Sequence, residues 1–326
     1  MEPALRLQRV TKTFGATRAV DELDLVVPRG ATYGFIGPSG AGKTTCIRMM
    51  MSILFPDSGA LSVLGRPSAL EAKDRIGYLP EERGVYRRMR VGDFLTFIAQ
   101  LKGVPADDAV GRARQLLERV GLGDIEKKKC EELSKGMAHR VEFVAAVINR
   151  PELLILDEPF SGLDPVSVKL LKDLVAEEQR RGATILFSTH VMTQAEELCQ
   201  HVVMIHRGRK VLDEPMAGLR RQYDPRVIQV EPLDERTPAD ALRAIDDVEQ
   251  VSQTVDGFEV HLRPGTEPTV AMQRIAAAVP VARVAIARLR LEDVFLRLVA
   301  ADAKDTDTEG ALQAKLKGLG SEGALA

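Results

Sequence analysis

One eight-residue segment constrains the fold of this chain more than any other feature. Residues 37–44 read Gly-Pro-Ser-Gly-Ala-Gly-Lys-Thr and match the pattern G-x-x-x-x-G-K-[ST] at every fixed position. The segment follows an apolar run, residues 31–36, and opens a run with helical character, residues 43–53. A strand, a glycine-rich turn and a helix in this order predict an α/β nucleotide-binding unit, because this context separates a phosphate loop from a glycine turn that binds nothing.

The chemistry of such a loop assigns a role to each residue type. Glycines let backbone N–H groups close around phosphate oxygens, and the helix N-terminus adds a fixed partial positive charge. We expect Lys43 to reach the β- and γ-phosphates of a bound nucleotide, the Thr44 hydroxyl to bind Mg²⁺ and Thr45 to contact a nearer phosphate. The expected phosphate-binding residues are Gly37, Pro38, Ser39, Gly40, Ala41, Gly42, Lys43, Thr44 and Thr45.

A second candidate site follows the apolar strand predicted at residues 153–156. Asp157 and Glu158 come directly after this strand, at the carboxyl end where open α/β sheets bind their ligands. We expect Asp157 to hold Mg²⁺ and Glu158 to act as the general base that polarises the attacking water. An isolated Asp-Glu pair could equally be a solvated strand end, but the phosphate loop in the same chain favours catalysis.

Patterning divides the chain into two domains and a tail. Helical spacing replaces strand signals over about residues 85–150, which predicts a helical insertion within a nucleotide-binding domain at 1–220. Apolar runs at 153–156, 184–187 and 202–205 alternate with helices and imply a parallel sheet covered on both faces. A β-α-β-β-α-β order then predicts a small ferredoxin-like domain at 223–302, and residues 303–326 are expected to be a flexible tail.

Composition narrows the class of partner. The 45 basic and 47 acidic residues nearly balance, whereas nucleic-acid-binding domains are usually strongly basic, so we expect no nucleic-acid partner. Three widely separated cysteines with no C-x-x-C pair suggest neither a metal site nor a disulfide framework and fit a reducing, cytosolic setting. We expect no signal peptide, and no run approaches the roughly 20 apolar residues of a membrane helix.

With these residues placed, the chain resembles an ABC transporter ATP-binding subunit over about residues 1–215. Residues 133–137, Leu-Ser-Lys-Gly-Met, occupy the position of the family signature LSGGQ just ahead of the Asp157 strand. Residues 161–164, Ser-Gly-Leu-Asp, resemble the family's D-loop, and His190 after Ser-Thr resembles the switch histidine. Several motifs in the right order are far more specific than a phosphate loop alone. The resemblance implies a P-loop NTPase core with a helical subdomain.

The resemblance also implies how the site is completed. In this family, ATP on the phosphate loop of one subunit is capped by the signature of another, so a chain with one copy of each must form a homodimer or pair with another ATPase subunit. Ser134 and Gly136 would then contact the γ-phosphate across the interface, with Asp164 close by, while His190 holds the same phosphate within its own subunit. Phe14 stands where the family stacks an aromatic ring on adenine, although a packed turn residue is the plainer alternative.

Two positions depart from the family pattern. Glu81 replaces the usual glutamine of the Q-loop; it still offers oxygen to Mg²⁺ or water but adds negative charge and loses an amide donor. In the signature, Lys135 adds a positive charge, and Met137 removes a polar group that could reach ribose. We expect Glu81 still to sense the metal, and we expect ATP capping to persist with weaker discrimination against GTP.

Residues 78–86 and 156–165 resemble the type-2 exporter branch that includes sodium-efflux ATPases, and residues 291–296 resemble the end of its C-terminal domain. This implies a separately encoded membrane permease, and a place for the ATPase on the cytoplasmic face of the membrane. A cytoplasmic helix of the permease could dock against Tyr86 and Phe94, unless both are core aromatics. Two alternatives stay open: an importer subunit with a regulatory C-terminal domain, or a soluble ABC ATPase outside transport.

Overall fold

The computed structural model describes residues 2–303, apart from 83, 223–225, 235–237 and 288–289. Its largest sheet has six strands in the order β5-β6-β7-β3-β8-β9, of which the first five are parallel and β9 pairs antiparallel with β8. The strands are β3 (Thr32–Ile36), β5 (Ile76–Leu79), β6 (Leu153–Asp157), β7 (Thr184–Thr189), β8 (His201–His206) and β9 (Arg209–Pro215). The predicted parallel sheet is confirmed. Strands β5 and β9, which the sequence patterning left out, extend it at its two edges.

A second, antiparallel sheet packs near the phosphate-loop helix. It has the order β2-β1-β4 and comprises β1 (Leu5–Phe14), β2 (Thr17–Val27) and β4 (Ser58–Val63). Helix α1 (Lys43–Met50) shares one buried cluster with both sheets, since Ile47 and Met50 are fully buried together with Leu7 of β1 and Phe35 of β3. Helix α1 is therefore held against two sheets at once.

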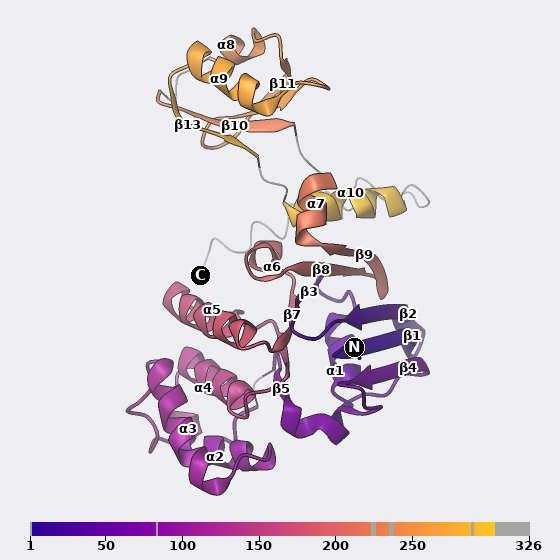
Figure 1. The fold of residues 1–326 in the computed structure, drawn as a ribbon, viewed down its shortest axis with the longest axis vertical. Helices are drawn as coiled ribbons and strands as arrows, with labels where there is room; N and C mark the ends of the chain where they lie inside the picture. Colours follow the sequence, from indigo (N-terminus) through magenta and orange to yellow (C-terminus); the bar gives the residue numbers. More distant parts are fainter. Residues whose placement is uncertain (1, 83, 223–225, 235–237, 288–289, 304–326) are drawn as a thin grey trace. The chain divides into compact units, whose positions relative to one another are not determined.

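The predicted insertion is helical. Figure 1 shows α2 (Val91–Leu101), α3 (Ala106–Arg119) and α4 (Lys135–Val147) grouped together beside β5 and α5 (Pro165–Arg180). The remaining helical elements of this unit are η1 (Ala69–Arg75), η2 (Cys130–Glu132) and α6 (Met192–Leu198), and α7 (Met216–Gln222) begins where the first segment of this unit ends and continues into the C-terminal unit. Among the residues described, no helix is both long and apolar enough to cross a membrane.

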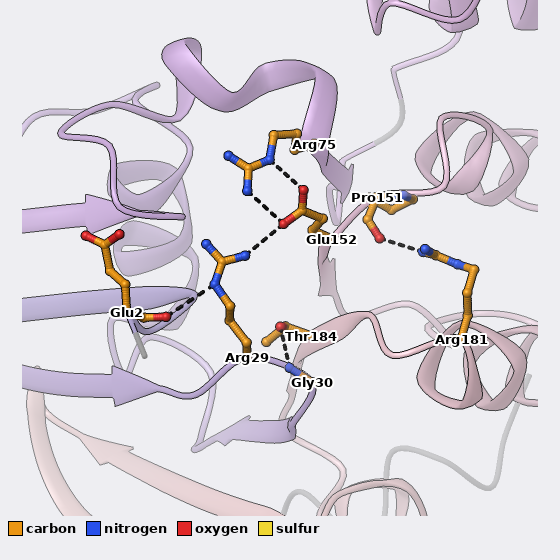
Figure 2. Close-up of polar contacts among 8 residues, drawn as sticks. All are labelled: Glu2, Arg29, Gly30, Arg75, Pro151, Glu152, Arg181 and Thr184. Atoms are coloured by element: carbon orange, nitrogen blue, oxygen red, sulfur yellow. Dashed lines mark hydrogen bonds and ion pairs between the residues drawn. The ribbon is translucent and has the colours of Figure 1, made fainter.

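The amino ends of the central strands are tied together by a polar network (Figure 2). The Glu152 carboxylate, directly ahead of β6, accepts two hydrogen bonds from Arg75 at 2.6 and 2.7 Å and one from Arg29 at 2.7 Å. The Gly30 N–H, ahead of β3, donates to the Thr184 hydroxyl at 2.9 Å. These contacts fix the relative positions of β5, β6, β7 and β3 at one edge, so their carboxyl ends are held at the other.

The C-terminal unit, Ala217–Val294, is described by itself. Its strands form an antiparallel sheet in the order β11-β12-β10-β13, and the chain order β-α-β-β-α-β confirms the ferredoxin-like prediction. Its elements are β10 (Val227–Pro232), α8 (Asp240–Arg243), β11 (Val248–Gln253), β12 (Phe258–Leu262), α9 (Pro268–Ala278) and β13 (Val281–Ile286). Alternate residues of β10 and β12 are buried with α9, as expected for a sheet with one covered face.

The last described helix, α10 (Leu291–Ala303), does not lie wholly within that unit. From Phe295 onward the chain belongs to the first unit, and the Phe295 ring packs edge-on against His206 of β8 with the ring centroids 5.8 Å apart. The tail expected at 303–326 lies outside the described residues except for Ala303.

Candidate functional site

The carboxyl ends of four parallel strands bring the predicted site residues to one edge of the sheet. The register pairs Ile36 of β3 with Thr189 of β7, and Asp157 of β6 with Ser188 of β7. The phosphate loop follows β3, Glu158 follows β6, His190 follows β7 and Glu81 follows β5 two residues on. Segments more than 100 residues apart in sequence therefore meet at the edge where open parallel sheets bind ligands.

Two glycines of the phosphate loop are required by close backbone contacts. Gly37 and Gly42 have φ angles of +154° and +105°, which side chains rarely allow. A Cβ atom on Gly37 would lie 2.2 Å from the Ile205 carbonyl oxygen, and one on Gly42 would lie 2.3 Å from the Ala19 carbonyl oxygen. Strands β8 and β2 thus hold the loop from behind.

Lys43, the first residue of α1, has its ammonium group folded over the loop. Its Nζ donates hydrogen bonds to the carbonyl oxygens of Gly37 at 2.7 Å and of Pro38 at 3.1 Å, and the residue is only 7% exposed. Burial lowers the pKa of Lys43, while the nearby carboxylates of Glu158, Asp157 and Glu81 oppose that shift. The predicted phosphate-binding cation therefore shares one small volume with all three predicted acidic residues.

Asp157 has the burial and the unpartnered oxygens expected of a metal ligand. It is 1% exposed, and within the described part of the chain neither of its carboxylate oxygens has a hydrogen-bond partner. Burial raises the pKa of Asp157, and the negative charge of Glu81 adds to the rise, while the adjacent Ser188 and Thr44 hydroxyls oppose it. A buried carboxylate with free oxygens, next to the Thr44 hydroxyl, is a donor set of the kind that Mg²⁺ prefers.

Glu158 is held in place by the residues at the end of β7. Its Oε1 accepts hydrogen bonds from the His190 backbone N–H at 2.8 Å and from the His190 ring Nδ1 at 2.7 Å, and its Oε2 accepts one from the Thr189 hydroxyl at 3.2 Å. Glu158 is 8% exposed, whereas the His190 side chain is about half exposed. The structure thus brings together the two residues expected to act on the γ-phosphate.

The signature residues begin a helix. Ser134 is the N-cap of α4, and its hydroxyl accepts a hydrogen bond from the Met137 N–H at 3.3 Å. A Cβ atom built on Gly136 would lie 4.0 Å from the Asp164 carboxylate, and one built on Gly162 would lie closer, 3.0 Å, to the Lys135 ammonium. The signature and the D-loop are therefore neighbours within one chain.

Asp164 has a local structural role besides its predicted one. It is the N-cap of α5, where its carboxylate accepts hydrogen bonds from the Ser167 hydroxyl at 2.6 Å and from the N–H groups of Val166 and Ser167 at 3.0 Å. These contacts, led by the Ser167 hydroxyl, lower the pKa of Asp164. A contact with nucleotide stays a prediction for this residue.

Phe14 lies at the end of β1 with 49% of its surface exposed, and the Lys12 ammonium is 5.7 Å from its ring centre. Phe14 pairs with Thr17 of β2, two residues from the Ala19 carbonyl that touches Gly42. The ring is therefore exposed on the strand pair that supports the phosphate loop. Stacking on adenine stays a prediction.

One of the two expected docking aromatics is in the core. Phe94 is 3% exposed and packs edge-on beneath Tyr86, with ring centroids 6.0 Å apart, so Phe94 cannot be a surface anchor. Tyr86 is 53% exposed, and Phe97, which the sequence analysis did not select, is 39% exposed and also packs edge-on against Tyr86 at 6.0 Å. Tyr86 and Phe97 form the exposed aromatic pair.

The sequence analysis assigned nothing to His139, yet the structure places it against the turn after Glu158. Its Nε2 lies 2.6 Å from the Pro159 carbonyl oxygen, and the residue is 5% exposed. The only signal in the sequence is a histidine on the apolar face of the helix after the signature, which is more often a core residue than a functional one.

Comparisons with known proteins agree with this geometry. Residues 20–161 match the family described as ABC transporter, and residues 215–299 match the family described as ATP-binding protein DrrA1-3-like, C-terminal domain. The uncharacterized ABC transporter ATP-binding protein YhaQ of Bacillus subtilis is 42% identical over 258 residues, which cover 79% of this chain and 86% of that protein.

Two further matches are a relative that covers more of the chain and a solved structure. The Nod factor export ATP-binding protein I of Burkholderia lata is 32% identical over 302 residues, covering 91% of this chain and 97% of that protein. A solved structure described as an ATP-binding subunit of an ABC transporter superposes with a TM-score of 0.63 at 30% identity, covering 68% of this chain and 93% of the other.

Proposed function

The chain belongs to the ATP-binding proteins of the ABC transporter family, which hydrolyse ATP to power transport, and from this premise we propose that it drives export through a separately encoded membrane permease. One observation favours export over import. Residues 215–299 form a DrrA-like C-terminal domain, and a relative that this chain covers almost end to end is named for Nod factor export. The proposal places the protein at the cytoplasmic face of the membrane, attached through the permease.

The residues at the sheet edge define the nucleotide site of this proposal. The N–H groups of the loop 37–42 receive the phosphates, and Lys43 exchanges its two carbonyl partners for phosphate oxygens. Thr44 and Asp157 hold Mg²⁺, with Glu81 as the third oxygen donor in reach of the same volume. A bound Mg²⁺ would neutralise phosphate charge during transfer. Phe14 contributes its exposed ring to the adenine.

Hydrolysis needs a general base beside the γ-phosphate, and we assign this role to Glu158. The three hydrogen bonds from His190 and Thr189 fix its carboxylate, and Oε2 keeps a lone pair with which to accept a proton from the attacking water. His190 then orients the γ-phosphate with its exposed ring. The short link between the two residues means that displacement of either one moves the other.

Closure of a pair of subunits completes the site in this proposal. Ser134 and Gly136, beside the D-loop residue Asp164, would cap the ATP held on the phosphate loop of a second copy of this chain or of another ATPase subunit. Tyr86 and Phe97 offer an exposed apolar contact on the helical subdomain, which suits the cytoplasmic helix of a permease.

Co-purification and flux test this function. The tagged chain, expressed in its native host and purified from the membranes, should retain an integral membrane protein. Vesicles that contain both proteins should move cargo away from the ATP-bearing side only when MgATP is hydrolysed. Glu158→Gln, which keeps the side-chain volume, is the matched control and should retain the membrane protein without flux. ATP-driven flux towards the ATP-bearing side would instead identify an importer. ATP hydrolysis with no membrane protein bound would favour the ABC ATPases outside transport.

A further inference from the structure

Two polar side chains lie one turn apart on the buried face of α4. His139 and Glu142 are 5% and 7% exposed, and they sit among the buried apolar residues Val141, Phe143, Val144 and Val147. Buried polar groups of this kind persist where each has a hydrogen-bond partner. Both residues have one, and the two partners belong to different parts of the ATPase site.

His139 holds the turn that carries the proposed catalytic base. Its Nε2 is 2.6 Å from the carbonyl oxygen of Pro159, and because a carbonyl can only accept, Nε2 carries the proton. Pro159 is bonded directly to Glu158, and the turn closes one step further on, where the Ser161 N–H donates to the Glu158 carbonyl at 3.1 Å. His139 therefore anchors the chain immediately beyond Glu158.

Glu142 holds the loop that carries Glu81. Its Oε1 accepts a hydrogen bond from the Gly84 N–H at 2.8 Å, three residues beyond Glu81. Its Oε2 lies 3.8 Å from the Nδ1 of His139, so the two buried side chains are also neighbours of each other. One helix, which starts at the signature residue Ser134, thus contacts both the Glu81 loop and the Glu158 turn through adjacent polar groups.

We propose that His139 and Glu142 are positioning residues that tie the orientation of Glu158 to the position of the Glu81 loop. The inference rests on the proposed ATPase site and adds to it a route within one subunit. A shift of the Glu81 loop moves Glu142, and the rigid helix turn carries that displacement to His139 and so to the Pro159 carbonyl. The hydrogen bonds of His139 and Glu142 go to backbone groups of the turn and the loop, so both residues should act on the rate of hydrolysis and not on ATP binding.

Steady-state ATPase kinetics of the full chain test the first half of this route. His139→Phe keeps the ring but loses the donor, and it should lower kcat about tenfold, the effect of one misplaced hydrogen bond at the base, with KM for MgATP changed less than about twofold. His139→Gln restores an N–H donor and should recover most of kcat. The control is His201→Phe, which likewise removes a histidine hydrogen bond, here to the Asp213 carboxylate outside the site.

A double-mutant cycle tests the link to the Glu81 loop. If the loop acts through the pair, Glu142→Leu and His139→Phe together should lower kcat no more than His139→Phe alone. Glu142→Gln keeps an acceptor for the Gly84 N–H, so it should fold and retain most of kcat.

Several results would overturn the inference. It is wrong if His139→Phe leaves kcat at the wild-type value, if His201→Phe lowers kcat as much, or if the effects of His139→Phe and Glu142→Leu multiply. A wild-type chain that does not hydrolyse ATP would refute the proposed function, and this inference with it. An active wild type with an unaffected His139→Phe variant refutes the inference alone.

Discussion

Replacing Asp157 with asparagine should stabilise the protein in the absence of nucleotide while removing the carboxylate that we propose as a ligand of Mg²⁺. Asp157 is 1% exposed, both of its carboxylate oxygens lack a hydrogen-bond partner in the described structure, and burial raises its pKa. An unsatisfied buried polar group costs about 1–3 kcal/mol, and a charged one costs more. Asp157→Asn removes the charge but leaves a polar amide, so we expect the free energy of unfolding to rise by about 1–3 kcal/mol, or roughly 2–10 °C in Tm.

The pH dependence of this effect has a defined sign. The pKa of Asp157 in the folded protein lies above its ordinary value of 3.8, so the folded state keeps its proton to higher pH than the unfolded chain does. Ionised Asp157 therefore costs stability near neutral pH, and the cost disappears as the pH falls through the folded-state pKa. The advantage of Asp157→Asn should shrink over the same interval.

Scanning calorimetry, first in EDTA without nucleotide and then with MgATP in an EDTA-free buffer, measures the stability and the metal dependence. Wild type should gain Tm on addition of MgATP, whereas Asp157→Asn should start higher and gain little. Asp213→Asn is the matched control with the opposite sign. Although burial raises the pKa of Asp213, hydrogen bonds from His201 and Lys210 bring it below its usual range, so its removal should lower Tm. An Asp157→Asn variant less stable than wild type in EDTA near neutral pH would refute the reasoning.

Three further predictions concern the base, the loop and the far edge of the sheet. Glu158→Gln should lower kcat about 10²- to 10⁴-fold while a fluorescent ATP analogue still binds, and undiminished hydrolysis would remove Glu158 from the mechanism. Gly42→Ala should lower the free energy of unfolding by roughly 2–4 kcal/mol in chemical denaturation, since the new Cβ meets the Ala19 carbonyl. The control Gly15→Ala, at φ +57° with open space around it, should lower it by only about 1 kcal/mol, and equal losses would contradict this reasoning. Glu152→Gln should cost at most about 1 kcal/mol near pH 7, because the carboxylate is about half exposed. Hydrogen bonds from Arg75 and then Arg29 lower the pKa of Glu152 in the folded protein, so the difference from wild type should begin to shrink near pH 4.5 and vanish as the pH falls through the lower folded-state pKa. A difference that does not change with pH would be inconsistent with the ion pairs.

The sequence predicted the sheet edge well because the rules involved are local. A short apolar run bounded by turns favours a buried strand, the full G-x-x-x-x-G-K-[ST] pattern between a strand and a helix favours a phosphate loop, and parallel strands align their carboxyl ends. These rules are enough to predict that Lys43, Asp157 and Glu158 lie at one edge of the sheet. The same reasoning found the C-terminal β-α-β-β-α-β order, whose turn at Asp256-Gly257 separates two short strands.

The sequence did not predict the elements and residues whose role depends on tertiary contacts. Strands β5 and β9 are short or carry polar residues, because each lies at an edge of the sheet, so their hydrophobic pattern is weak. His139 and Glu142 look like ordinary residues of an amphipathic helix until the fold brings Pro159 and Gly84 to them. Phe94 and Phe97 are both aromatic residues at helical spacing, and only packing decides that one is buried and the other exposed.

The geometry of Glu158 shows what a motif alone cannot specify. In an extended strand, Asp157 and Glu158 would point to opposite faces of the sheet, because successive side chains alternate. Glu158 instead has a left-handed φ of +49°, a conformation that costs a non-glycine residue about 1–2 kcal/mol. The three hydrogen bonds from Thr189 and His190 offset that cost, and the turn directs both carboxylates towards the phosphate loop. The catalytic orientation of Glu158 therefore depends on β7, a strand that the Asp-Glu pair itself does not encode.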